Sequence, residues 1–195
     1  MFALVQDGSI TKYISGNRGI TIGDIQYPQN IFTLWSAAER EAIGIYEVVF
    51  DNSNKKDEAY YINTKQSFNF ADGVVTASYG SATAKELDDR NATNEAGEEL
   101  DPVVVIEGLK TKHKKIIKKQ ASGLLEPTDW YNHKALDDDT FTIPANITTY
   151  RANIRTRSNE METAIDNASD VDALAALYVY KDGERPLGEF PILEI

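Results

Sequence analysis

The sequence predicts an α+β protein in which a small antiparallel, β-rich N-terminal domain precedes a C-terminal helical hairpin or small helical bundle. Three observations lead to this expectation. Over residues 1–84, apolar and polar side chains alternate as they do in half-buried strands. Residues 85–101 are strongly acidic and poor in large apolar groups, which is typical of a linker. From residue 102 to 183, apolar side chains recur at helical spacing.

Two Asp-Gly dipeptides predict two hairpins in the N-terminal domain. Asp7-Gly8 lies between two short alternating segments, and Asp72-Gly73 lies between residues 59–70 and 74–79. Glycine adopts positive φ without steric cost, so Asp-Gly favours the type I′ turn that joins antiparallel strands.

A short helix and a further strand are expected between these hairpins. Ser36 and Glu39 have the spacing of a capping box, which predicts a helix over residues 37–42 that Gly44 ends. Residues 45–50 are rich in β-branched and aromatic side chains and should form the strand.

The helical part is expected to begin at Asp101-Pro102, because Asp can cap free amides and Pro at the first helical position has no donor to lose. Glu126-Pro127 should end this first long helix, and Thr128 or Asp129 can cap the short helix that follows.

Pro144 should start a second long helix, and Ser169 with Asp172 repeats the capping-box spacing before a last short one. Residues 184–195 are predicted to form an extended C-terminal tail. The second long helix carries one apolar stripe: Ile147, Tyr150, Ile154, Met161, Ile165 and Ala168.

Composition excludes several classes of protein. The chain has 195 residues and no cysteine, so disulfides, thiolate nucleophiles and cysteine-based metal sites are excluded. A formal charge of −11 disfavours binding to nucleic acid. No apolar run is long enough to span a bilayer, and the first residues lack the pattern of a secretion signal. We therefore expect no membrane partner and a protein that is made in a cytosol.

Six lysines form the one cationic face that the sequence predicts, and this face could bind nucleic acid or an acidic partner. The competing interpretation is a solvated helix face opposite the acidic linker, which we favour because aromatic and arginine side chains are missing from this segment. The lysines are Lys110, Lys112, Lys114, Lys115, Lys118 and Lys119.

No motif points to catalysis, a cofactor or a metal. Asp137, Asp138 and Asp139 lack the spacing of a calcium loop, and His133 beside them is more typical of a surface residue. The chain contains no Gly-rich phosphate loop and no sequence typical of a serine or zinc hydrolase. We predict that the protein is not an enzyme and has no catalytic residues, bound metal or cofactor.

Trp130 and Tyr131 are the first candidates for a binding anchor, because interface hot spots are rich in these residue types. Packing in a core between the two long helices is the competing interpretation, and we favour it.

Two stretches of the chain resemble bacteriophage tail proteins. Residues 1–8, Tyr27-Pro28 and residues 35–48 are similar to the N-terminal region found in many phage tail-fibre and tail-associated proteins. Residues 124–130, followed by Ile143-Pro144 and residues 150–155, resemble the helical "TDW … YR" segment of tail assembly chaperone-like domains. The acidic and lysine-rich stretch at 85–119 departs from this pattern.

The resemblance implies a non-enzymatic role in building or completing a phage tail, as a virion structural component or an assembly factor. The implied partner is a phage tail or tail-fibre protein, with a homo-oligomer left open, and the implied location is the virion tail or the host cytoplasm during assembly. Trp130, Tyr150 and Arg151 match the motif, and with Tyr131 they are the expected structural or partner-contact residues.

A carbohydrate-binding or carbohydrate-degrading accessory of the tail is the alternative function. It is suggested by Tyr60, Tyr61 and Tyr79, which lie near predicted loops. Sugar rings stack on aromatic faces of this kind.

Overall fold

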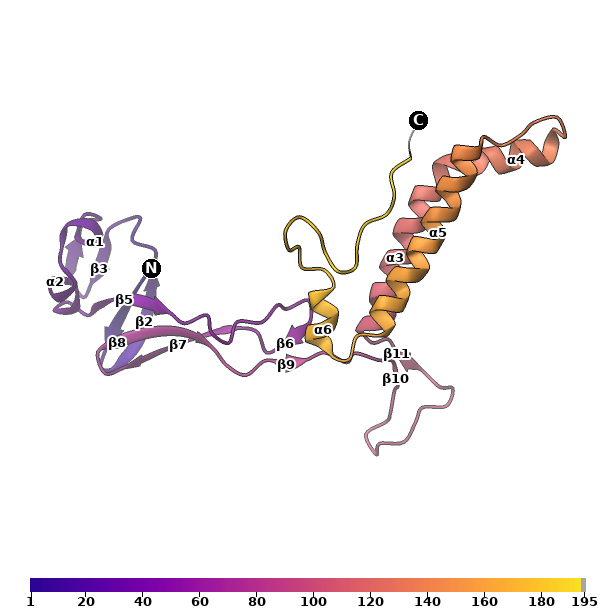
Figure 1. Cartoon of the computed structure of the whole chain (residues 1–195). Coiled ribbons are helices and arrows are strands. Elements are labelled where there is room, and N and C mark those ends of the chain that lie inside the picture. Colours follow the sequence, from indigo (N-terminus) through magenta and orange to yellow (C-terminus); the bar gives the residue numbers. More distant parts are fainter. Residues whose placement is uncertain (194–195) are drawn as a thin grey trace. The chain divides into compact units, whose positions relative to one another are not determined.

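The computed structural model describes residues 1–193 and confirms the α+β fold class (Figure 1). Strands dominate the first part of the chain, and helices dominate the second. The chain divides into two compact units, one over residues 1–83 and one from residue 84 onward. The last two residues of the predicted tail, 194 and 195, lie outside the described part of the chain.

A five-stranded sheet with the order β2-β1-β5-β8-β7 forms the centre of the first unit. Neighbouring strands run antiparallel, as predicted, except β5 and β8, which form one parallel pair. The reason is that β8 enters the sheet as the second strand of a hairpin, opposite in direction to β7. The strands are β1 (Phe2–Gln6), β2 (Ser9–Ile14), β5 (Ile45–Phe50), β7 (Gln66–Ala71) and β8 (Val74–Tyr79).

Both Asp-Gly turns are confirmed. Asp7 and Gly8 have φ values of 51° and 73°, and Asp72 and Gly73 have φ values of 51° and 76°, as a type I′ turn requires. The second hairpin is shorter than predicted, because residues 59–65 do not extend β7. Part of this segment forms β6 (Tyr61–Ile62), which pairs with β9 (Thr83–Ala84).

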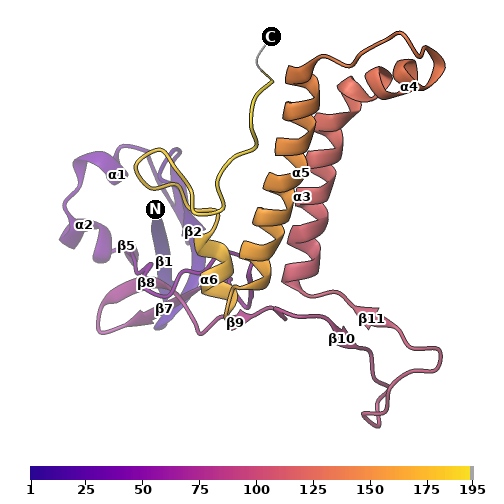
Figure 2. The same cartoon turned by 45° about the vertical axis from the view of Figure 1, so that its right-hand side comes forward.

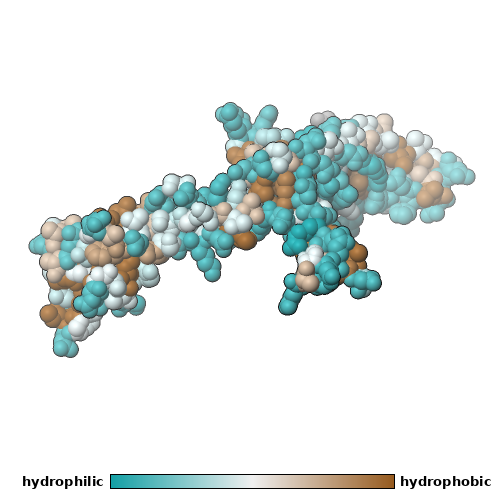
Figure 3. All heavy atoms as spheres, turned by 90° about the horizontal axis from the view of Figure 1, so that it is seen from below, coloured by the Kyte–Doolittle hydropathy of each residue, from teal (hydrophilic) through white to brown (hydrophobic). Residues whose placement is uncertain are grey.

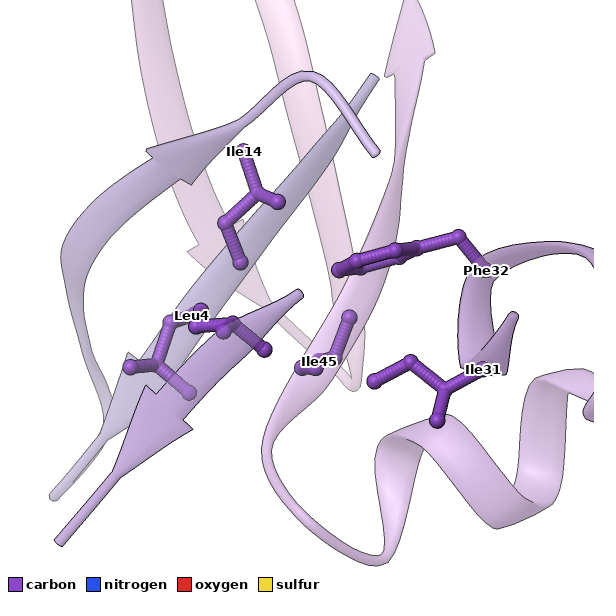
Figure 4. Close-up of a cluster of buried hydrophobic side chains, with 6 residues drawn as sticks. Leu4, Ile14, Ile31, Phe32 and Ile45 are labelled. Carbon is purple, nitrogen blue, oxygen red and sulfur yellow. The ribbon is translucent and has the colours of Figure 1, made fainter. Parts of the chain in front are cut away.

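One face of the sheet is covered by short elements from residues 20–41. Ile31 and Phe32 pack on Leu4, Ile14 and Ile45 of the strands (Figure 4). The predicted capping box is present, with the Ser36 amide donating to Glu39 at 2.8 Å and the Glu39 amide donating to the Ser36 hydroxyl at 3.3 Å. The covering elements are β3 (Ile20–Ile22), β4 (Ile25–Tyr27), α1 (Ile31–Leu34) and α2 (Ala37–Glu41).

The other face is buried because the sheet curls toward itself. The ring centroids of Tyr13 on edge strand β2 and Phe68 on edge strand β7 lie 4.6 Å apart. Small or β-branched side chains occupy the interior of this curl, where little space is left. They are Ala3, Val5, Val48, Val75 and Ala77.

Two long antiparallel helices form the second unit, and they lie side by side in both views (Figures 1 and 2). All six residues of the apolar stripe predicted for the second long helix are buried, which confirms its helical period. The elements are β10 (Arg90–Asn91), β11 (Val105–Ile106), α3 (Leu109–Leu125), the 3₁₀ turn η1 (Glu126–Thr128), α4 (Asp129–Asp137), α5 (Ala145–Asp166) and α6 (Val171–Ala176).

The sequence predicts that the first long helix begins at Pro102. In the structure it begins at Leu109. Residues 103–106 are β-branched, and two of them pair with Arg90 and Asn91 in a small antiparallel ladder. Part of the expected linker over 85–101 is therefore a strand. The last short helix also differs at its start, because Asp170, and not Ser169, accepts the capping hydrogen bond from the Ala173 amide at 2.8 Å.

The acidic stretch also supplies the cap of α3. The amides of Leu109 and Lys110 donate to the carbonyls of Glu86 and Leu87 at 2.9 and 3.0 Å. The Asp89 carboxylate accepts from the Gly108 amide at 2.8 Å. A Cβ on Gly108 would lie 2.5 Å from the carbonyl carbon of Asp88, so only glycine permits this approach.

Replacing Ile154 with Ala should destabilise the second unit by about 2–5 kcal/mol, because it leaves a cavity where a side chain with 0% exposure now packs. Chemical denaturation followed by helical circular dichroism measures this loss. Ile116 is 50% exposed on α3, so Ile116→Ala serves as the control and should change stability by less than about 1 kcal/mol. Equal losses in the two variants would contradict the packing described above.

Lowering the pH should weaken the contact between His113 and Tyr178, whose ring nitrogen and hydroxyl lie 2.8 Å apart. Burial lowers the pKa of His113 below its ordinary value of 6.5, so the unfolded chain takes up the proton more readily than the folded chain. Stability should therefore fall as the pH decreases below 6.5. Unfolding measured at about pH 7.5 and about pH 5.5 should show a smaller loss for His113→Gln than for the unchanged protein, and an identical loss would refute this role.

Candidate functional site

The strongest candidate site lies where α3 passes into α5. Residues 126–144 make this connection through η1, α4 and the turn after α4, and we call them the hairpin tip. In Figure 2, α4 points away from the paired long helices instead of lying along them. Its side chains are exposed or half-buried, and none of its residues is fully buried.

Arg151 of α5 holds the hairpin tip in place. Its side chain is 8% exposed, and one guanidinium nitrogen donates to the Leu125 carbonyl at 2.9 Å and to the Thr128 hydroxyl at 2.5 Å. The other terminal nitrogen donates to the Asp129 carboxylate at 2.7 Å. A single planar cation therefore joins the end of α3, the 3₁₀ turn and the first residue of α4 to α5.

Two further hydrogen bonds complete this arrangement. The Thr128 hydroxyl donates to the Leu125 carbonyl at 2.7 Å, which leaves its oxygen free to accept from Arg151. The hydroxyl of Tyr150, which is 9% exposed, donates to the Leu124 carbonyl at 3.3 Å. Tyr150 and Arg151 thus act structurally, because their hydrogen bonds hold the end of α3 and the hairpin tip to α5.

Exposed Trp130 packs with half-buried Tyr131 and Phe141 in an aromatic cluster at the hairpin tip. The rings of Trp130 and Tyr131 stack with centroids 3.8 Å apart, and Phe141 lies 6.3 Å from each. Trp130 is 51% exposed, so the expectation that it packs between the two long helices is wrong. The reason is the direction of α4, which carries this residue beyond the hairpin core. We call these three residues the aromatic platform.

The carboxylates after α4 form a turn. Asp138 accepts hydrogen bonds from the hydroxyl and the amide of Thr140 at 2.6 and 3.0 Å, and these bonds lower the pKa of its carboxyl. Over residues 1–193, no group of three or more acidic or histidine side chains is arranged to hold a metal ion. His133 is exposed on the same helix.

Four of the six lysines of α3 form ion pairs inside the second unit. Lys114 and Lys118 pair with Asp166 and Glu162 of α5 at 2.7 and 3.2 Å. Lys110 pairs with Asp88 at 3.0 Å, and Lys115 pairs with Glu107. Hydrophilic side chains cover most of the face of this unit that Figure 3 presents, with apolar side chains in small patches between them.

An open groove lies beside Arg151 between α3 and α5, with a volume of about 480 Å³. Its lining includes Leu125, Arg155 and Asn159. Arg155 is exposed and donates to the Arg151 carbonyl at 3.3 Å.

The tyrosines of the carbohydrate alternative lie in the first unit and are all half-buried. The ammonium of Lys56 lies 4.8 Å from the centre of the Tyr61 ring and covers one of its faces. Tyr79 lines an open cavity of about 530 Å³ together with Thr64 and Asp57.

Comparisons with known proteins yield no match, whether with family models, curated sequences or solved structures. In residues 1–193, no helix combines the length and the apolar content that crossing a bilayer requires.

Sequence reasoning selected Trp130, Tyr131, Tyr150 and Arg151, and the structure brings all four to one end of the hairpin. It missed Phe141 as a third aromatic side chain, and it missed the bond between Thr128 and Arg151. The bond between Thr128 and Arg151 could have been predicted from the short connection between the two amphipathic segments. Such a connection favours an antiparallel hairpin, in which residues around 128 and 151 lie opposite each other.

Arg151→Met should destabilise the second unit by about 1–3 kcal/mol and loosen α4, because the Leu125 carbonyl and Asp129 lose their donor. Urea denaturation gives the stability, and hydrogen–deuterium exchange of the α4 amides reports the loosening. Arg155→Met, one turn further along α5, removes an exposed cation of the same size and should leave both nearly unchanged. If the two variants behave alike, Arg151 does not hold the tip.

Proposed function

We propose that this chain is a non-enzymatic, tail-associated bacteriophage protein that binds a tail or tail-fibre protein through its hairpin tip. The observation that carries the proposal is the aromatic platform, in which Trp130 is 51% exposed on a helix with no buried residue. A tryptophan that stays exposed while half-buried aromatic rings support it provides apolar area for a partner to cover.

The anchoring of the tip favours binding. A partner loses affinity when binding must first order a flexible segment. Arg151 and Thr128 tie the start of α4 to both long helices, so much of this ordering is complete before the partner arrives. An aromatic surface on a fixed support is a suitable interface anchor.

The resemblance to tail assembly chaperone-like segments supports the same conclusion. Its "TDW … YR" residues have complementary roles here, because Thr128, Asp129, Tyr150 and Arg151 hold the bend while Trp130 stays exposed. A motif that fixes a turn and presents one large aromatic side chain fits recognition of another protein. The resemblance of residues 1–8 and 35–48 to tail-associated proteins points to the same setting.

Under this proposal the chain acts in the virion tail or in the host cytoplasm during assembly. A virion structural component would be present at fixed copy number in purified particles, and an assembly factor would be found with its partner only in infected cells. Quantitative mass spectrometry of both fractions distinguishes the two roles.

In cells infected by a phage that encodes the chain, Trp130→Ala should reduce recovery of a tail or tail-fibre protein with the affinity-tagged chain by about tenfold or more, since hot-spot truncations cost about 2 kcal/mol or more. The matched control is Ile116→Ala, which truncates a side chain that is 50% exposed on α3.

Circular dichroism should show that both variants remain folded. Equal recovery of the tail protein with the two variants, or the absence of any tail protein with the unchanged chain, would contradict the proposal.

A further inference from the structure

We infer that the partner segment that occupies the aromatic platform is basic, with an arginine or lysine side chain on the exposed face of Trp130. This inference rests on the proposed function, since it specifies the chemistry of the partner that the hairpin tip binds. It follows from the charge of the tip, from the geometry of α4 and from a cation that already lies on one of the three rings.

The hairpin tip is acidic. Its residues include one lysine, Lys134, and five carboxylates: Glu126, Asp129, Asp137, Asp138 and Asp139. Arg151 neutralises Asp129, and one oxygen of Asp138, Oδ1, accepts both hydrogen bonds of the turn at Thr140. Asp137 and Asp139 are exposed, and within residues 1–193 neither forms an ion pair. Glu126 is likewise exposed and forms no ion pair within these residues, so three carboxylates remain available to a partner, two of them just after Lys134.

The spacing along α4 places one of these carboxylates on the same side as the tryptophan. Trp130, Lys134 and Asp137 are separated by four and three residues, which are the intervals that align side chains along one helix face. A cationic side chain on the Trp130 ring would therefore lie over the same helix face as Asp137.

The platform already binds a cation within the chain. The ammonium of Lys134 lies 4.3 Å from the centre of the Phe141 ring. Tryptophan is a stronger cation acceptor than phenylalanine, and the Trp130 ring is more open to a partner. An arginine side chain can also stack its planar guanidinium on this ring.

Other partner chemistries fit the tip less well. An acidic protein segment or nucleic acid would be repelled by the remaining carboxylates. A purely apolar segment would remove water from Asp137 without offering it a donor, which is unfavourable. A basic segment covers the rings and pairs with the carboxylates at the same time.

Binding of two synthetic peptides to the full chain tests this inference. One peptide alternates arginine with glycine, the other alternates glutamate with glycine, and nuclear magnetic resonance follows the two tryptophan side-chain N–H signals. A Trp35→Phe variant identifies the signal of Trp130. The arginine peptide should shift the Trp130 signal and leave that of Trp35 in place, and the glutamate peptide should shift neither.

The double variant Asp137→Asn/Asp139→Asn should bind the arginine peptide at least about threefold more weakly, because two attractive charges are lost. The control, Glu95→Gln/Asp101→Asn, makes the same change in net charge in the acidic stretch before α3 and should bind as the unchanged chain does. A Trp130 signal that does not move, equal shifts with both peptides, or equal weakening in the two double variants would overturn the inference.

Failure of this inference is distinguishable from failure of the proposed function. If Trp130→Ala loses the tail protein and Asp137→Asn/Asp139→Asn retains it in full, the tip binds a tail protein that is not recognised by its basic charge. If Trp130→Ala retains the tail protein, the proposed function is wrong whatever the arginine peptide does.

Discussion

The second unit depends on one buried cation at the end of its helical hairpin. Arg151 binds acceptors from three successive segments, namely the end of α3, the 3₁₀ turn and the start of α4. A lysine ammonium could not reach these groups with one planar fork of donors. Burial of the charge is tolerated because its hydrogen bonds are made, and within residues 1–193 no buried side-chain polar atom lacks a partner. The direction of α4, and with it the position of Trp130, follows from this contact.

Some charged side chains of the second unit form ion pairs within it, and others remain accessible to solvent. The lysines of α3 face carboxylates of α5 and of the preceding acidic stretch, so the most basic segment of the sequence serves largely to hold the unit together. The carboxylates of the hairpin tip have fewer internal partners. The recognition surface that we propose, defined by aromatic rings and negative charge, thus lies on a chain whose most conspicuous sequence feature is a lysine cluster.

Local patterns predicted most of the elements, and contacts between distant residues explain the errors. The Asp-Gly turns, the capping box at Ser36 and the stripe of α5 each depend on neighbouring residues, and all are confirmed. The start of α3 could not be predicted from local sequence, because residues 105–106 become strand β11 only by pairing with β10. The four selected site residues do come together, yet an aromatic pattern alone cannot show whether a helix lies along a hairpin or leaves it. The hydrogen bonds of Arg151 to Leu125, Thr128 and Asp129 fix the bend at which α4 leaves the hairpin.

Site-specific photo-crosslinking tests most directly whether Trp130 contacts a phage tail protein, as we propose. A photoreactive phenylalanine analogue is placed at position 130 or at position 116, and the chain is irradiated in infected cells during tail assembly. We expect a covalent product with one tail or tail-fibre protein from position 130 and none from position 116. No tail protein captured from position 130, or the same products from both positions, would contradict the proposal.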